Sequence, residues 1–296
     1  MMDVFNIPNT NIINWVFTTN GTTNAWQTWQ KPKNCKFVFM TVIGGGGGGG
    51  GGTSGVGNRA GGGGGGSSAV SKGFYNADAL PDILYIQVGP GGSPGAANGN
   101  GGSGALSYVT VIPDTVTMNS ILRSGAAAAG GGTSLGVAGA AGTIFAQTSG
   151  LVGYLGLFQA IAGQIGATGV SATIGSSITL AGITSGGAGG GGASNASGFA
   201  GGSIIGIGRV PTLPGGTADS TENGSPGYQP LIPNFNSSVN TDVFFTGGSG
   251  GAGGAIVNGT NGGPGAFGCG GAGGGAGATA GQGGRGGDGI VIITAW

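Results

Sequence analysis

The sequence FVFMTVIGGGGGGGGG, residues 37–52, passes from a strand pattern directly into bare glycine. Its first seven residues are almost all apolar, which is typical of a strand covered on both faces. The nine glycines that follow have no side chains to bury, so only their peptide groups can hold them in place. This junction predicts both parts of the fold, a β framework and glycine segments that leave it.

The composition of the whole chain argues against several classes of function. Of 296 residues 80 are glycine, 5% are charged, the net charge is zero and histidine is absent. Nucleic-acid binding requires clustered Lys and Arg, and acid–base enzymes working near neutral pH usually use His. Matches to G-x-G-x-x-G arise by chance in such a sequence and none lies in a βαβ pattern. We therefore expect a non-enzymatic protein with no cofactor and no nucleic-acid partner.

The glycine tracts have three possible structures. Collagen requires glycine at every third position, and this period is absent. A flexible linker leaves the peptide groups solvated, whereas ordering each residue costs about 1–2 kcal/mol and each hydrogen bond returns only about 1 kcal/mol. Extended glycine helices of polyproline-II geometry can form lateral hydrogen bonds with their neighbours and so build a lattice. In this arrangement the most peptide groups find a partner. We predict such a lattice, with Gly47 and Gly63 as scaffold residues that do not tolerate valine.

Several short segments predict the β framework, because they are β-branched or aromatic and bounded by glycine or proline. No segment predicts a helix with any strength; residues 151–162 are a weak candidate, and their glycines oppose it. The predicted fold is all-β, a small β-sandwich-like framework whose glycine-rich excursions pack as a polyglycine-II-like lattice. Residues 1–25 are expected to form an N-terminal attachment arm, and residues 26–296 the domain, with an inserted loop at 203–246. The predicted strands are residues 37–43, 83–88, 106–112, 178–183 and 290–296.

Two further patterns concern covalent and metal chemistry. Cys35 and Cys269 are far apart in sequence, and two small buried thiols are favoured over a disulfide. Residues 283–291 fit the calcium-binding nonapeptide pattern once, but adjacent turns share each ion in a β-roll, so a single copy is insufficient. A tight turn into the last strand is favoured over calcium at Asp288, and we expect no metal site.

Three segments in order carry a family resemblance. They are WQKP at residues 29–32 followed by the strand and glycine run at 37–52, LYIQVGPGG at 84–92, and GGRGGDGIVII at 283–293. Together they resemble the glycine-rich domain of bacteriophage tail fibres and related virion proteins, over roughly residues 26–296. In this resemblance Trp29 and Pro32 belong to the scaffold.

The resemblance implies a structural or receptor-binding component at the tail or capsid surface of a phage particle. It implies attachment to other virion proteins through the N-terminal arm, and to a host cell-surface glycan or outer-membrane protein. Receptor recognition is expected where the chain carries large side chains between the glycine tracts, in residues 209–245 and 67–81. The aromatic side chains of these two segments could equally pack beneath their own loops. The candidate receptor-binding residues are Lys72, Phe74, Tyr75, Tyr228, Leu231, Phe235 and Phe244.

Two other functions remain open from the sequence. A capsid or tail decoration protein would need no receptor site. A surface-polysaccharide depolymerase would need two carboxylates set across a sugar, for which Asp78 with Asp82 and Asp219 with Glu222 are the close pairs.

Residues 124–208 carry no charge, which favours a buried interface between subunits over a membrane-active segment at 151–162. We expect a homo-oligomer, and the phage resemblance suggests a trimer.

Overall fold

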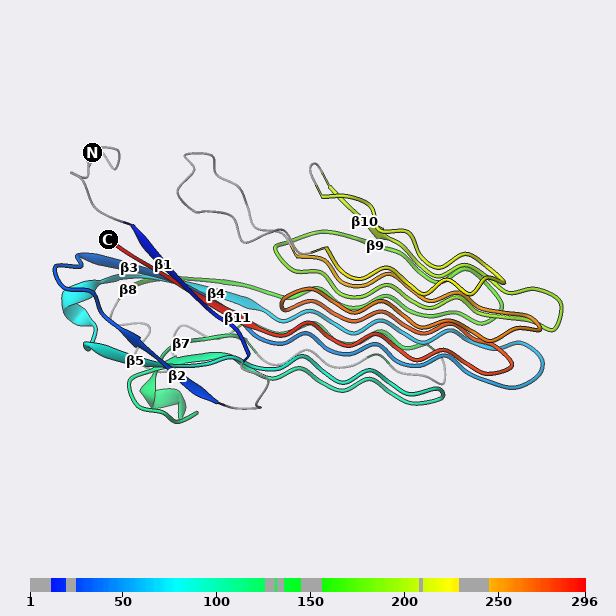
Figure 1. Ribbon diagram of the computed structural model, residues 1–296, viewed down its shortest axis with the longest axis horizontal. Helices are drawn as coiled ribbons and strands as arrows, with labels where there is room; N and C mark the ends of the chain where they lie inside the picture. Colours follow the sequence, from blue (N-terminus) through cyan, green and yellow to red (C-terminus); the bar gives the residue numbers. More distant parts are fainter. Residues whose placement is uncertain are drawn as a thin grey trace.

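The computed structural model describes residues 12–19, 25–125, 131, 136–144, 156–207, 210–228 and 245–296. The molecule is elongated, with β-sheets at one end and a bundle of undulating extended tracts running away from them (Figure 1). The described helical elements are two short 3-10 turns, η1 (Ala77–Ala79) and η2 (Thr117–Asn119). The prediction of an all-β fold is confirmed.

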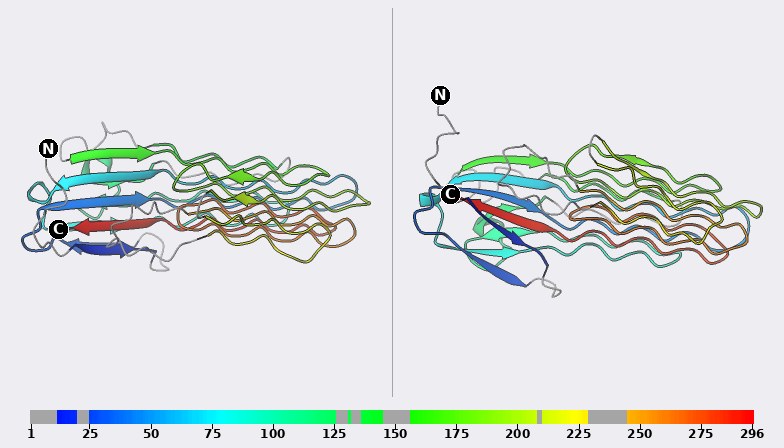
Figure 2. Two further views of the ribbon diagram at one scale, coloured as in Figure 1. Left: turned by 90° about the horizontal axis from the view of Figure 1, so that it is seen from above. Right: turned by 45° about the horizontal axis from the view of Figure 1, so that its top comes forward.

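The larger sheet at this end has five antiparallel strands (Figure 2). Its central strand β3 (Phe37–Ile43) coincides with the predicted one. Val38, Met40 and Val42 alternate along β3 and are buried on the inner face, as the two-residue period of a strand requires. The strand order is β1 (Ile13–Phe17), β11 (Ile290–Ala295), β3, β4 (Val70–Asn76) and β8 (Gly156–Ile161).

A smaller antiparallel sheet covers the inner face of the five-stranded one. Trp29, Leu84 and Ile86 from this sheet pack with Val38 and Met40 in one core, so the two sheets form a sandwich. Trp29 is buried and meets Trp15 edge-to-face, with ring centroids 5.8 Å apart. The smaller sheet has the order β2 (Trp26–Gln30), β5 (Ile83–Gln87), β6 (Tyr108–Thr110) and β7 (Ser120–Arg123), and β9 (Ile178–Thr179) pairs with β10 (Ile204–Ile205) further along the molecule.

The glycine tracts form a lattice with a repeat of three residues. In the tract that follows β3, every third amide donates to the same neighbouring tract, at N–O distances of 2.8–3.0 Å. Three residues per turn without internal bonds is the geometry of polyproline II. Gly45, Gly48 and Gly51 donate to Ala105, Gly102 and Gly99; Gly46, Gly49 and Gly52 to Gly287, Gly284 and Gly281; Gly47, Gly50 and Thr53 to Gly66, Gly63 and Ala60.

Tracts in the middle of the lattice have six neighbours. The tract at 269–277 donates to the tracts at 47–53, 185–191 and 260–263, and accepts from three others at 62–68, 248–254 and 281–287. Such close approach needs glycine: a Cβ added at almost any interior glycine would fall within 3.0 Å of a backbone atom of a neighbouring tract. The predicted polyglycine-II lattice is therefore the packing observed.

Buried hydroxyls connect the sheets to the lattice. Ser68 Oγ accepts from the amide of Gly44 at 3.1 Å, where β3 gives way to the glycine tract. Ser107 Oγ accepts from the amide of Gly89 at 3.0 Å and donates to the carbonyl of Ile43 at 2.8 Å. These side chains replace partners that the backbone loses as the strand pattern changes to the three-residue repeat.

Some segments differ from the sequence prediction. Ile13–Phe17, assigned to the attachment arm, forms the edge strand β1. Residues 156–161 of the weak helix candidate form strand β8, and residues 151–155 lie outside the described residues. The described part of the insert at 203–246 joins the lattice, for example through the Gly216 amide on Gly250 and the Gly224 amide on Asn261. Both cysteines are free thiols, as predicted, but only Cys269 is buried, whereas Cys35 is half-buried.

Candidate recognition tip

The lattice tracts reverse direction in a group of short turns at the end of the molecule away from the sheets (Figures 1 and 2). Most tracts run the length of the lattice, so turns far apart in sequence meet there. We call this group the distal tip. It comprises residues 53–60, 96–99, 170–175, 194–198, 217–222, 254–259 and 276–280.

A single buried cation holds three of these turns. Arg59 is only 5% exposed. Its guanidinium donates to the carbonyls of Gly55 at 2.9 Å, Ser194 at 2.6 Å and Ala255 at 2.9 Å. Hydrogen bonds from a charged group are stronger than neutral ones, so Arg59 fixes the turns at 53–60, 194–198 and 254–259 relative to one another.

Other side chains tie the remaining turns together. The Asp219 carboxylate accepts from the amides of Gly198 at 3.0 Å and Ala255 at 2.8 Å. Asn98 accepts from the Ser54 amide at 3.0 Å and donates to the Ser54 hydroxyl at 2.7 Å. The distal tip is consequently a cross-braced surface, with its loops ordered by the scaffold beneath them.

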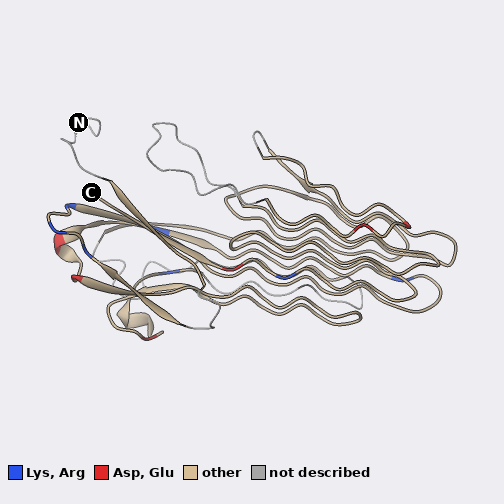
Figure 3. Cartoon of the chain, viewed as in Figure 1, with Lys and Arg blue, Asp and Glu red and all other residues tan. Residues whose placement is uncertain are grey.

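Large aliphatic side chains are exposed on the distal tip. Val56 is 93% exposed, Ile256 87% and Ile174 62%. Two carboxylates, Asp219 and Glu222, are also exposed there, whereas Arg59 is buried; Glu222 accepts from Thr217 Oγ1 at 2.9 Å. Figure 3 shows charged residues gathered mainly at the sheet end and sparse along the lattice. Exposed aliphatic side chains on a rigid support are a feature of interaction surfaces.

The first group of predicted receptor-binding residues lies at the opposite end, on β4. Phe74 stacks on Phe37 with ring centroids 5.4 Å apart and lies 5.8 Å from the ring of Trp296. Tyr75 is buried; its hydroxyl donates to the carbonyl of Ile121 at 3.3 Å, and burial raises its pKa. Lys72 is half-buried and lies beside Thr41 and Gln159 in the strand register. Tyr75 is thus a core residue, and Lys72 and Phe74 lie on the outer face of the large sheet.

The second group is divided between the lattice and the part of the chain outside the described residues. Tyr228 is half-buried, and its backbone bonds Thr246 in both directions, at 2.6 Å to the hydroxyl and 3.1 Å from the amide. Leu231, Phe235 and Phe244 lie outside the described residues. The described candidates therefore do not form one site. The sequence did not predict the distal tip as a recognition surface, because that prediction rested on aromatic residues and prolines, whereas the turns of the tip contain Val, Ile, Asn and Ser.

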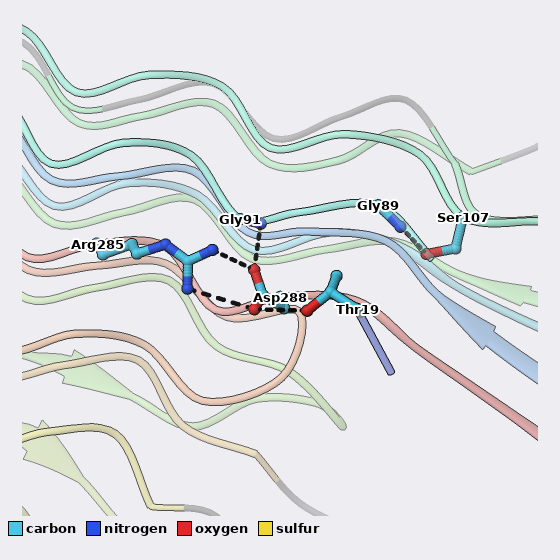
Figure 4. A network of polar contacts seen from close by, with 6 residues as sticks. All are labelled: Thr19, Gly89, Gly91, Ser107, Arg285 and Asp288. Atoms are coloured by element: carbon cyan, nitrogen blue, oxygen red, sulfur yellow. Dashed lines mark hydrogen bonds and ion pairs between the residues drawn. The ribbon is translucent and has the colours of Figure 1, made fainter. Parts of the chain in front are cut away.

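Asp288 joins a strand to the lattice (Figure 4). Its carboxylate accepts from the Gly91 amide at 2.8 Å, from Thr19 Oγ1 at 3.0 Å and from the Arg285 guanidinium, with which it forms an ion pair. Burial alone would raise the pKa of Asp288, but the Gly91 amide, Arg285 and Thr19 together hold it below its ordinary value. The side chain is committed to protein donors. The predicted tight turn is not present, because residues 281–289 form an extended lattice tract that runs directly into β11.

The two carboxylate pairs make contacts with other parts of the chain. Asp219 of the Asp219–Glu222 pair holds tip amides, and Asp82 of the other pair lies 3.1 Å from the ammonium of Lys31. Within the described residues, no three Cys, Asp or Glu side chains gather as metal ligands. The described part of the chain contains no helix long and apolar enough to cross a membrane.

The two packed sheets, continued by a hydrogen-bonded glycine lattice, define an all-β protein built on a glycine scaffold. The model of the glycine-rich domain family matches residues 18–296, and the chain belongs to this family. No curated protein matches it.

Proposed function

We propose that the protein is a non-enzymatic structural component of a bacteriophage particle, of the tail-fibre or spike type, whose distal tip attaches to a receptor on the host cell. One observation carries the proposal: a stiff lattice brings turns from distant parts of the chain onto one surface with exposed Val56 and Ile256. The resemblance of residues 29–52, 84–92 and 283–293 to phage tail-fibre domains supplies the virion setting.

The lattice suits this role physically. Loops lose conformational freedom when they bind a partner, and this cost lowers affinity. At the distal tip Arg59, Asp219 and Asn98 already hold the turns in the free protein. The accessible groups include aliphatic side chains and the Asp219 and Glu222 carboxylates, so attachment to an outer-membrane protein or a glycan would combine apolar and charged contacts.

We propose that the opposite end faces the particle. Both described ends of the chain, Ile12 and Trp296, lie at the sheet end (Figure 1). There the outer sheet face carries the Phe37, Phe74 and Trp296 cluster, a kind of surface that favours protein contacts. Other virion proteins would bind here and through the N-terminal residues that precede β1, and the assembled form would be a homo-oligomer, with a trimer as the first expectation.

The test measures binding of the fluorescently labelled protein to intact cells of candidate bacterial hosts. The double variant Val56→Glu, Ile256→Glu should abolish binding, because contact with the receptor would bury the two new carboxylates and remove their hydration. Met118→Glu is the matched control, since Met118 is 71% exposed in η2 at the sheet end. Binding to virions but to no cells would indicate a decoration protein, and release of reducing sugar from surface polysaccharide would indicate a depolymerase. Either result would overturn the proposal.

A further inference from the structure

The chain contains a series of Asn–Gly dipeptides, which are the peptide bonds most prone to spontaneous deamidation. The glycine amide nitrogen attacks the asparagine side-chain carbonyl carbon, ammonia leaves, and water then opens the cyclic imide to aspartate or isoaspartate. Glycine favours this step because it has no Cβ to hinder the approach and can adopt the required backbone geometry. The described dipeptides are 98–99, 100–101, 223–224, 258–259 and 261–262.

The fold engages the attacking nitrogen in all five dipeptides. Each glycine amide donates a backbone hydrogen bond, and attack requires that this bond first open. The bonds run from Gly99 to Ala96 at 2.7 Å, Gly101 to Gly131 at 2.9 Å, Gly224 to Asn261 at 2.8 Å, Gly259 to Thr279 at 2.8 Å and Gly262 to Gln282 at 2.9 Å.

The asparagine side chains are held to different degrees. Asn223 Oδ1 accepts from the Asn261 amide at 2.9 Å, and Asn261 Oδ1 accepts from the Gln282 amide at 2.8 Å. Asn98 is bonded twice to Ser54, and Asn100 also has an interaction partner. Asn258 is exposed at the distal tip, and no described residue bonds its side chain.

We propose that, among the five described dipeptides, Asn258 is the one that deamidates in the folded protein, and that the lattice protects the other four. At Asn258 only the Gly259–Thr279 bond must open, whereas Asn223 and Asn261 must also release a side-chain bond that holds a lattice amide. The inference does not depend on the proposed function.

Modification would change the chemistry of the distal tip. Either product places a new carboxylate beside the exposed Ile256 and Val257, in a region where Asp219 and Glu222 are occupied by hydrogen bonds. Isoaspartate also lengthens the main chain by one methylene, which displaces the Gly259 amide from the Thr279 carbonyl.

The experiment incubates the folded protein in mildly alkaline ¹⁸O-labelled water and follows each dipeptide by peptide mapping with mass spectrometry. Asn258 should deamidate about fivefold faster than Asn223 and Asn261, since one extra hydrogen bond of about 1 kcal/mol slows opening at those two sites. In denaturant the five sites should react at rates within a few-fold of one another, because the same Asn–Gly chemistry is then unprotected.

Asn258→Ser is the control variant: it should remove the native signal and leave the melting temperature unchanged, because nothing described bonds the Asn258 side chain. The proposal is overturned if any of the other four sites reacts as fast as Asn258 in the folded protein. It is also overturned if Asn258 is unmodified after the unfolded chain has reacted at all five sites.

Discussion

Replacing Gly63 by alanine tests the lattice most directly, because a single methyl group has opposite effects in a lattice and in a flexible tract. In a flexible or unhindered segment, Gly→Ala usually stabilises a protein by about 0.4–1 kcal/mol, since the unfolded chain loses freedom. At Gly63 a Cβ would lie 2.7 Å from the carbonyl oxygen of Gly136 and closer still to that of Val137. The tracts at 61–66 and 136–142 must therefore separate.

The size of the effect follows from the bonds between these two tracts. The Gly139 amide donates to Gly64 and the Gly142 amide to Ser67, both at 2.8 Å. Each bond contributes about 1 kcal/mol and costs more when left unmade in a buried site, while overpacking adds about 1–3 kcal/mol. After the entropic gain is subtracted, we expect Gly63→Ala to destabilise the protein by about 2–4 kcal/mol.

The assay is thermal unfolding followed by circular dichroism, with Gly182→Ala as the matched control. A Cβ at Gly182 meets no atom within 4 Å, so this variant should be neutral or slightly more stable. Gly63→Ala should lower the melting temperature by about 5–10 °C for a chain of this size. Equal melting temperatures for the two variants would show that the glycine tracts are not close-packed.

Four further outcomes are expected. Amides of residues 44–66 should exchange slowly with deuterium, since their bonds lie inside the lattice; rapid exchange throughout would contradict the scaffold. Arg59→Met should cost about 2–4 kcal/mol, by removing three charge-assisted, part-buried hydrogen bonds, and should speed exchange at the distal tip measured by mass spectrometry. The pKa of Asp288 is lowered on folding from 3.8, so its contribution is present above that value and is lost as the pH falls through the folded pKa; acid titration of Asp288→Asn should show a weaker loss of stability than the parent chain. Calcium and chelators should leave the melting temperature unchanged, because the Asp288 carboxylate is bonded to Gly91, Thr19 and Arg285; a calcium-dependent rise would reopen a metal role.

The sequence was sufficient to predict that the glycine tracts form a lattice, because other conformations leave too many peptide groups without partners. It could not show which tract lies beside which. The tract at 44–53 bonds tracts more than 200 residues away, at 281–287, as well as the nearby one at 60–66. All tracts have nearly the same chemistry, so their pairing depends on register in three dimensions and leaves no local pattern.

Strand β4 shows why part of the framework escaped prediction. Its sequence VSKGFYN places polar residues and Gly73 within a strand, which normally weakens the assignment. In the fold the ring of Tyr75 lies over Gly73, where a Cβ would come 2.5 Å from the nearest ring carbon. Glycine here makes room for an inward-facing tyrosine, and only tertiary packing reveals this need.

The same geometry separates stability from surface chemistry. The backbone bonds of the lattice depend on glycine in the tracts, whereas Val56 and Ile256 lie in turns and are almost fully exposed. Side chains in such turns can change without forcing tracts apart, provided that Arg59 and its three carbonyl partners persist. A glycine scaffold can thus carry many different distal surfaces, because its tracts are held together mostly by backbone hydrogen bonds.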